Sequence, residues 1–213
     1  MVISQLVELI DRGVLFRSGD SADIKSKRIF DVLVRSQKSH PITSGQWSLL
    51  SDFMILHVTR EGEGMKSVFR VWEHNWNAKN GWSSAEKDTP KVSKVITAGG
   101  SGAEAFFEWD RKWQKSAVGR TSRAVFSAFC DALKSEKDPF CGGCPQIGGL
   151  FRTGVSNQFG VIFDKRRYIA GLETSGDWQN SKLEWFNELF ERCDPESLII
   201  KKGAQRQPRP KGI

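Results

Sequence analysis

Apolar and polar residues alternate on both sides of a polar, glycine-containing stretch between residues 51 and 76. The order SDFMILHVT, REGEGM, VFRVWEHNW predicts an antiparallel β-hairpin. If the turn centres on Gly62 and Glu63, Asp52 lies opposite Glu73. Strand side chains alternate between two faces. One face then has an apolar middle and a polar end, and it consists of Asp52, Met54, Leu56, Val58, Phe69, Val71, Glu73 and Asn75.

Apolar residues at helical spacing predict helices elsewhere in the chain. Two lie ahead of the hairpin: one over Ser4–Ile10, and one that starts after Asp20 or Ser21 and carries lysine and arginine on its outer face. Two more follow at Ala103–Lys115 and Arg120–Lys134. A last helix is predicted over Ser181–Cys193, where Pro195 ends it.

The remaining elements are strands and loops. Residues 77–90 are rich in polar and turn-forming residues and predict an exposed loop, and residues 92–97 predict a strand. Three strands at Ile147–Arg152, Phe159–Phe163 and Arg166–Glu173 predict a meander, and Leu198–Ile200 a short edge strand. The basic, proline-containing residues 201–213 predict a disordered tail.

The fold class predicted from these elements is α+β. A central antiparallel sheet bears the hairpin between flanking helices, and the C-terminal β-meander is capped by the last helix. The chain divides into residues 1–98, residues 103–200 and the tail 201–213, where the first two parts either fold separately or form one domain.

Length and composition bound the class of protein. The chain has 213 residues, of which 38% are hydrophobic and 27% charged, as in soluble globular proteins. No apolar run approaches the ~20 residues that span a bilayer. The N-terminal segment contains Glu8 and Asp11 within its apolar stretch, so it does not read as a secretory signal. A cytoplasmic protein with reduced or metal-bound cysteines is therefore expected.

A positive net charge makes nucleic acid the expected partner. Lysine and arginine number 32 against 25 aspartate and glutamate, which gives a net charge of +7 and a pI near 9.3. Such a balance attracts polyanions. Two basic sets are the candidate contacts with phosphate, one at the corner between the two middle helices and one in the meander. They are Arg111, Lys112, Arg120 and Arg123, and Arg152, Lys165, Arg166 and Arg167.

The acidic end of the hairpin is a candidate magnesium site. Asp52 and Glu73 on neighbouring strands would hold a hard divalent cation against a phosphate. This arrangement resembles, in part, the metal site of restriction-type nucleases, which place a second acidic residue two positions before a lysine. Asn75 stands where that lysine is expected, and the resemblance covers few residues. A hydrogen-bonded pair of strand-end residues explains the same pattern.

Cysteine and histidine supply two further candidates. Cys141 and Cys144 form a CGGC knuckle that suits zinc, with Cys130 and Cys193 as the remaining thiols. Alternatively Cys130, on an apolar helix stripe, is a small buried residue. His57 and His74 are predicted to lie on diagonal cross-strand positions, where they would share a metal, act as a general base or simply pack.

The leading hypothesis is a nucleic-acid-binding protein, with a metal-dependent DNA endonuclease of prokaryotic restriction or defence type as its catalytic version. In that version Asp52, Glu73, Asn75 and His74 form the catalytic set. The alternative is a non-catalytic RNA- or protein-binding subunit of a nucleoprotein complex that docks through Trp76, Trp82 and Trp113. A third option is an enzyme for a small anionic substrate held by Arg152 and Arg167.

Overall fold

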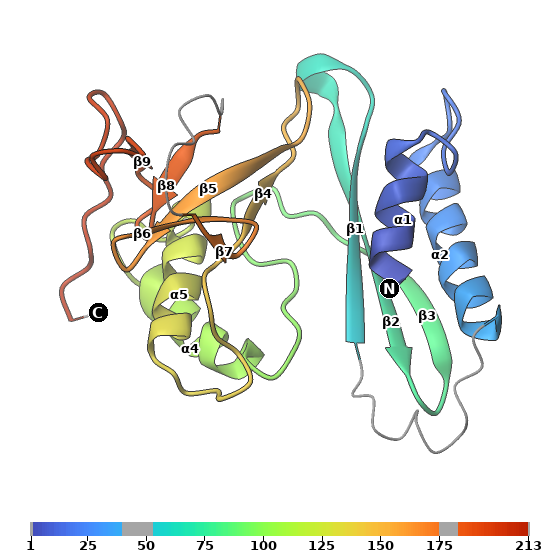
Figure 1. The fold of residues 1–213 in the computed structure, drawn as a ribbon, viewed down its shortest axis with the longest axis horizontal. Helices are drawn as coiled ribbons and strands as arrows, with labels where there is room; N and C mark the ends of the chain where they lie inside the picture. The colour runs from blue at the N-terminus through green and yellow to red at the C-terminus, as the bar shows by residue number, and fades with distance from the viewer. Residues whose placement is uncertain (1, 40–52, 175–182, 213) are drawn as a thin grey trace. The chain divides into compact units, whose positions relative to one another are not determined.

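The computed structural model describes residues 2–39, 53–174 and 183–212 (Figure 1). The chain divides into two compact units, here called unit 1 (Met1–Thr89) and unit 2 (Pro90–Ile213). The division falls earlier than the predicted end of the first part at residue 98. Helices and mixed sheets occur together, so the predicted α+β class is confirmed. No helix in the described ranges is both long and apolar enough to cross a membrane.

Unit 1 begins with the two predicted helices, α1 (Val2–Asp11) and α2 (Ala22–Ser39). They meet through a core of Leu6, Leu15, Ile29 and Leu33. Ile55 of the sheet packs against this core, so the helices cover one face of it. The second helix begins where expected, because Ser21 Oγ accepts the backbone N–H of Ile24, which is an N-cap interaction.

The sheet of unit 1 has three antiparallel strands in the order β1-β2-β3: β1 (Phe53–Glu61), β2 (Val68–Asn77) and β3 (Gly81–Lys87). The predicted loop over residues 77–90 was wrong for its middle half, since residues 81–87 form β3. Asn77 starts a tight turn there, because its Oδ1 accepts the backbone N–H groups of Lys79 and Asn80.

The hairpin exists, but its predicted register was wrong. Glu73 lies opposite Leu56, and Met54 lies opposite Asn75. The connection is longer than the two-residue turn that was assumed, because a single 3-10 turn, η1 (Gly64–Lys66), lies inside it. The shift is an even number of residues, so the predicted face still holds Met54, Leu56, Val58, Phe69, Val71, Glu73 and Asn75 among the described residues.

Unit 2 contains the two predicted middle helices, α4 (Ala103–Gln114) and α5 (Ser122–Lys134). They pack through Phe106, Trp113, Ala124 and Ala128. The far end of α5 contacts the sheet, where Cys130 and Leu133 meet Val161 and Phe163. The predicted strand at residues 92–97 was wrong, since this stretch has no regular secondary structure.

The sheet of unit 2 extends the predicted meander. β4 (Ile147–Gly149), β5 (Asn157–Phe163), β6 (Arg166–Ile169) and β7 (Leu172–Glu173) follow one another, each antiparallel to its neighbour. β8 (Trp185–Asn187) pairs in parallel with β5, and β9 (Arg192–Cys193) pairs with β8. The predicted edge strand at Leu198–Ile200 contributes one bridge, between Ile200 and Cys193.

The predicted helix over Ser181–Cys193 was wrong in its described part, which is the β8–β9 hairpin. Asn187 Oδ1 accepts the backbone N–H groups of Leu189 and Glu191, and this turn reverses the chain. Trp185 and Cys193 are therefore paired across two strands. Gly160 makes the packing of β8 possible, because a Cβ there would lie 2.3 Å from the Trp185 ring.

Candidate nucleic-acid interface

The corner between α4 and α5 gathers cations from both helix ends. Arg111 and Lys112 lie in the last turn of α4, and Lys115 is its C-cap residue. Arg120 precedes Thr121, the N-cap of α5. Within the described chain none of Arg111, Lys112, Lys115 and Arg120 pairs with a carboxylate. All four residues are exposed, and Lys112 Nζ lies over the ring of Trp109, 3.9 Å from its centroid.

The turn that forms this corner is tight. Arg120 donates its backbone N–H to Gln114 Oε1 (2.7 Å), which brings the start of α5 back onto the end of α4. A Cβ at Gly119 would lie 2.3 Å from the carbonyl oxygen of Gln114, so only glycine fits. Arg120 itself has φ 58°, in the left-handed region that non-glycine residues rarely occupy. The corner therefore holds an arginine in a costly conformation beside a helix N-terminus, where anions are favoured.

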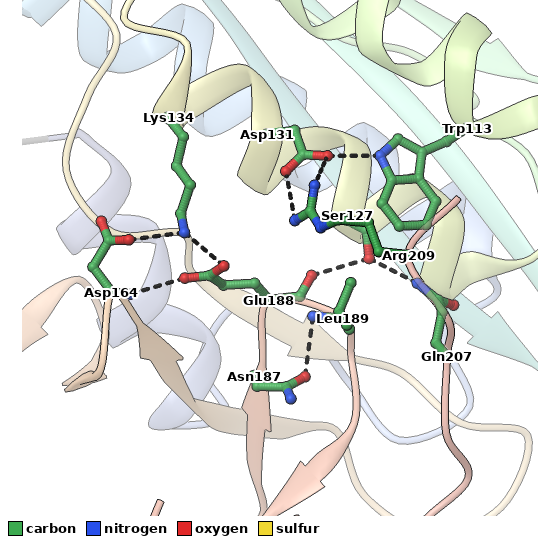
Figure 2. A network of polar contacts seen from close by, with 10 residues as sticks. All are labelled: Trp113, Ser127, Asp131, Lys134, Asp164, Asn187, Glu188, Leu189, Gln207 and Arg209. Carbon is green, nitrogen blue, oxygen red and sulfur yellow. Dashed lines mark hydrogen bonds and ion pairs between the residues drawn. The ribbon is translucent and has the colours of Figure 1, made fainter. Parts of the chain in front are cut away.

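The C-terminal segment runs along α5, and the prediction of a disordered tail was wrong for residues 204–209. Arg123 Nη1 donates to the carbonyl of Gln205 (3.0 Å), and Gln207 Nε2 donates to Ser127 Oγ (2.8 Å). Arg209 makes a two-pronged ion pair with Asp131, both N–O distances being 3.0 Å (Figure 2). We call residues 205–209 the C-terminal strap.

The spacing of these contacts explains the fit. Partners on α5 are four residues apart, which is about 6 Å along a helix axis. Partners on the C-terminal strap are two residues apart, which is also about 6 Å in an extended chain. Pro208 and Pro210 favour that extended conformation. The strap therefore stays in register with α5 over three contacts.

Buried polar groups hold the middle of the C-terminal strap. Gln207 is 3% exposed, and its backbone N–H donates to Glu191 Oε1 (2.8 Å). The other oxygen of Glu191 accepts from Asn187 Nδ2 (2.8 Å). Asp131 is 5% exposed and also accepts from Trp113 Nε1 (2.8 Å). Each of these buried carboxylates depends on the C-terminal strap for part of its hydrogen bonding.

The second predicted basic set, in the meander, is mixed with acids. Arg166 pairs with Glu173 (3.3 Å), and Arg167 Nη1 donates to the carbonyl of Pro195 (3.2 Å). Lys165 is exposed at the β5–β6 turn, next to Asp164. Asp164 is in turn paired with Lys134 (2.8 Å). Arg152 is exposed in the segment between β4 and β5.

The two sets do not form one continuous positive surface. Arg123 lies in the first turn of α5, whereas Lys134 is its last residue. Lys134 pairs with Glu188 (2.6 Å) as well as with Asp164, so acidic groups occupy the end of α5 near the meander (Figure 2). The α4–α5 corner is therefore the stronger candidate for binding an anion.

The hairpin site is only partly described. Asp52 lies outside the described residues. Glu73 accepts from Asn75 Nδ2 (2.6 Å) and pairs with Lys87 Nζ of β3 (3.4 Å). A lysine is thus present beside Glu73, but it comes from a strand that the sequence pattern did not predict. In the described ranges no three His, Cys, Asp or Glu residues form a group suited to a metal ion.

The two histidines lie as predicted on diagonal positions, with ring centroids 6.3 Å apart and nearly parallel planes. They belong to a column of rings on the helix-covered face, in which Trp72 stacks on His57 (5.3 Å) and Phe30 on His74 (6.0 Å). His74 is fully buried, and neither of its nitrogens has a hydrogen-bond partner among the described residues. Burial lowers the pKa of both histidines, that of His57 to about 4, with His74 and Lys25 as further causes for His57. The geometry is that of packed, neutral rings.

Cys130 and Cys193 are buried in unit 2, whereas Cys141 and Cys144 are partly buried. Cys141 and Cys144 pack on the cluster that contains Cys130, whereas Cys193 belongs to another cluster. Burial raises the pKa of the Cys144 thiol to about 12 and also raises the pKa of Cys130 and of Cys193. These thiols are therefore protonated near neutral pH, which disfavours metal binding and redox reactivity at Cys130 and Cys144.

The tryptophans of the alternative hypothesis do not form a docking surface. Trp76 is 2% exposed and Trp113 is fully buried. Trp82 packs against the core of unit 1. Trp82 lies on β3, which the sequence pattern did not predict, and Trp113 packs against Ala124 and Ala128 of α5.

Comparison with protein-family models, with curated proteins and with solved structures finds no significant match to this chain. The fold and the site define a class, a two-unit α+β protein with an exposed basic helix corner.

Unit 2 carries most of the net positive charge. It contains 20 lysine and arginine against 14 aspartate and glutamate residues, whereas unit 1 contains 12 against 11.

Proposed function

We propose that this chain binds nucleic acid through the phosphate backbone, using the α4–α5 corner of unit 2. The observation that carries the proposal is the set of exposed cations at that corner with no carboxylate partner among the described residues. Arg123, from the first turn of α5, lies beside them. Side chains of this kind neutralise phosphates and release counterions.

The corner supports backbone binding in two further ways. The N-terminus of α5 lies at this corner, where the helix dipole favours negative charge, and Thr121 Oγ1 accepts the backbone N–H of Ala124 as its N-cap. The concentration of net charge in unit 2 supplies long-range attraction for a polyanion. Both effects are independent of base sequence, so the proposal is one of backbone recognition.

The proposal is limited to binding. Glu73 is the described half of the predicted magnesium pair. It already forms an ion pair with Lys87 and accepts a hydrogen bond from Asn75. Catalysis by the hairpin is kept as a separate hypothesis. It requires magnesium-dependent cleavage that Glu73→Gln abolishes while binding stays intact.

Titration of labelled duplex DNA and single-stranded RNA over a range of salt concentrations tests the proposal. About five phosphate contacts predict that log K falls with log[salt] with a slope of roughly −4.5 for duplex DNA. The triple variant Arg111→Gln, Lys112→Gln, Arg120→Gln should reduce that slope by roughly 2.7. Its matched control removes three exposed lysines of unit 1, namely Lys27→Gln, Lys38→Gln and Lys66→Gln. An affinity that does not change with salt concentration, or an equal loss of affinity in both triple variants, would refute the assignment to the corner.

A further inference from the structure

We infer that the Asp131–Arg209 ion pair is a positioning element for the nucleic-acid interface. It holds the C-terminal strap on α5 so that the strap completes the α4–α5 corner. Asp131 is a negative charge inside the most positive unit of the chain, yet its loss should weaken polyanion binding. The inference rests on the proposed function of the corner.

The Asp131–Arg209 ion pair is well suited to hold the C-terminal strap. The two guanidinium nitrogens of Arg209 meet the two carboxylate oxygens of Asp131, both at 3.0 Å, which is the geometry of a strong charge-assisted pair. Asp131 is 5% exposed and keeps its Trp113 hydrogen bond on the other side. Without Arg209 this carboxylate would be left with one described partner in a buried place.

The C-terminal strap connects this ion pair to the α4–α5 corner. From Arg209 the C-terminal strap passes Gln207, held by Ser127 and Glu191, and reaches Gln205, whose carbonyl accepts from Arg123. The strap thus orients the guanidinium of Arg123, a member of the predicted phosphate-binding set. It also fixes the backbone of the exposed Arg206 next to that end of α5.

A docked strap also lowers the entropic cost of binding, compared with a free tail. A free tail must be ordered when a ligand binds, and that ordering opposes binding. A docked strap presents Arg206 and Arg123 already in place. Release of the strap should therefore cost about one phosphate contact, which is a slope change of about 0.9 and roughly a fivefold loss of affinity near 0.15 M salt.

The Asp131→Asn variant distinguishes an effect of net charge from an effect of strap position, because the two predict opposite changes in affinity. If only net charge matters, this variant is more positive and binds duplex DNA as tightly as the wild type or more so. If the strap positions the corner, it binds roughly fivefold more weakly with a shallower salt slope. Arg209→Lys provides the second test, because it keeps the charge but cannot make the two-pronged pair.

The experiment measures binding of labelled duplex DNA by the full-length chain, together with hydrogen exchange at the backbone amide of Gln207. Arg192→Lys is the matched control, since it makes the same substitution in an exposed ion pair, with Glu184, that lies outside the C-terminal strap. Gln207→Ala removes the hydrogen bond to Ser127 and loosens the strap without changing a residue of α5, in case Asp131→Asn fails to fold. We expect faster exchange and weaker binding in Asp131→Asn, Arg209→Lys and Gln207→Ala, and neither change in Arg192→Lys.

Two results overturn the inference. Undiminished binding by a folded Asp131→Asn or Arg209→Lys variant shows that the strap does not position the corner. Unchanged exchange at Gln207 in those variants shows that the ion pair does not hold the strap. Failure of the proposed function looks different, because the wild type itself would then bind no nucleic acid at low salt while exchange at Gln207 still responds to Arg209→Lys.

Discussion

Acidification from pH 7 to pH 5 should destabilise unit 1, because His57 and His74 are held neutral by burial. Burial is the main cause that lowers the pKa of both histidines below the ordinary 6.5, in the case of His57 to about 4. The unfolded chain therefore takes up protons as the pH falls through 6.5, and the folded chain does not. Stability is fully present above pH 6.5 and falls as the pH approaches 4.

The size of the effect follows from the shift of His57. Linkage between a pKa of 6.5 and one of about 4 corresponds to about 2 kcal/mol between pH 7 and pH 5. His57 is only partly buried, and solvent screening reduces its share to roughly 1 kcal/mol. His74 contributes in the same direction. The carboxylates on this face, Asp23 and Glu86, have pKa values lowered by Arg70, so they stay charged above pH 5.

Urea unfolding at pH 7 and pH 5, followed through the amide signals of β1 and β2, reads unit 1 separately. His74→Leu removes one titrating group at similar volume, so its midpoint should depend less on pH than that of the wild type. A pH titration of the folded protein, followed through the histidine ring protons, should show pKa values below 6.5 for both His57 and His74. A wild-type midpoint that stays constant or rises at pH 5, or a His74 pKa at or above 6.5, refutes the reasoning.

Other predictions concern unit 2. Gly160→Ala should destabilise it by ~2 kcal/mol in thermal or urea unfolding, because the new Cβ meets the Trp185 ring; Gly148→Ala, with no atom within 4 Å of its Cβ, should do much less. Trp113→Phe should cost ~2 kcal/mol, because Asp131 loses a buried hydrogen bond; no change would contradict that role. Cys130, which is buried, should react with a thiol reagent at pH 8 only after denaturation, and fast reaction of this thiol in the native protein would contradict its burial.

Periodicity in the sequence determined the local elements and the faces they present. Helices α1, α2, α4 and α5 were predictable because each carries an apolar stripe at helical spacing. The membership of the hairpin face survived a wrong register, because an even shift leaves each side chain on the same face. The diagonal pairing of His57 and His74 followed from the same alternation.

Turn geometry and pairing between distant strands decided the hairpin register and the β8–β9 strands. The hairpin register depends on η1, whose conformation no apolar pattern encodes. The residues of β8 and β9 carry apolar positions that also fit a helix, and only the turn at Asn187 and the parallel pairing with β5 make them strands. Both choices depend on hydrogen bonds that local propensity does not contain.

The candidate interface divides in the same way. The sequence by itself determined which cations lie at the α4–α5 corner, because helix ends and a short connection place them close together. It also predicted a disordered tail, since a proline-rich basic segment has no apolar face of its own. Only the tertiary structure brings Arg209 to Asp131, 78 positions away along the chain. A buried carboxylate selects its partner by geometry and charge in three dimensions, and no local pattern carries that information.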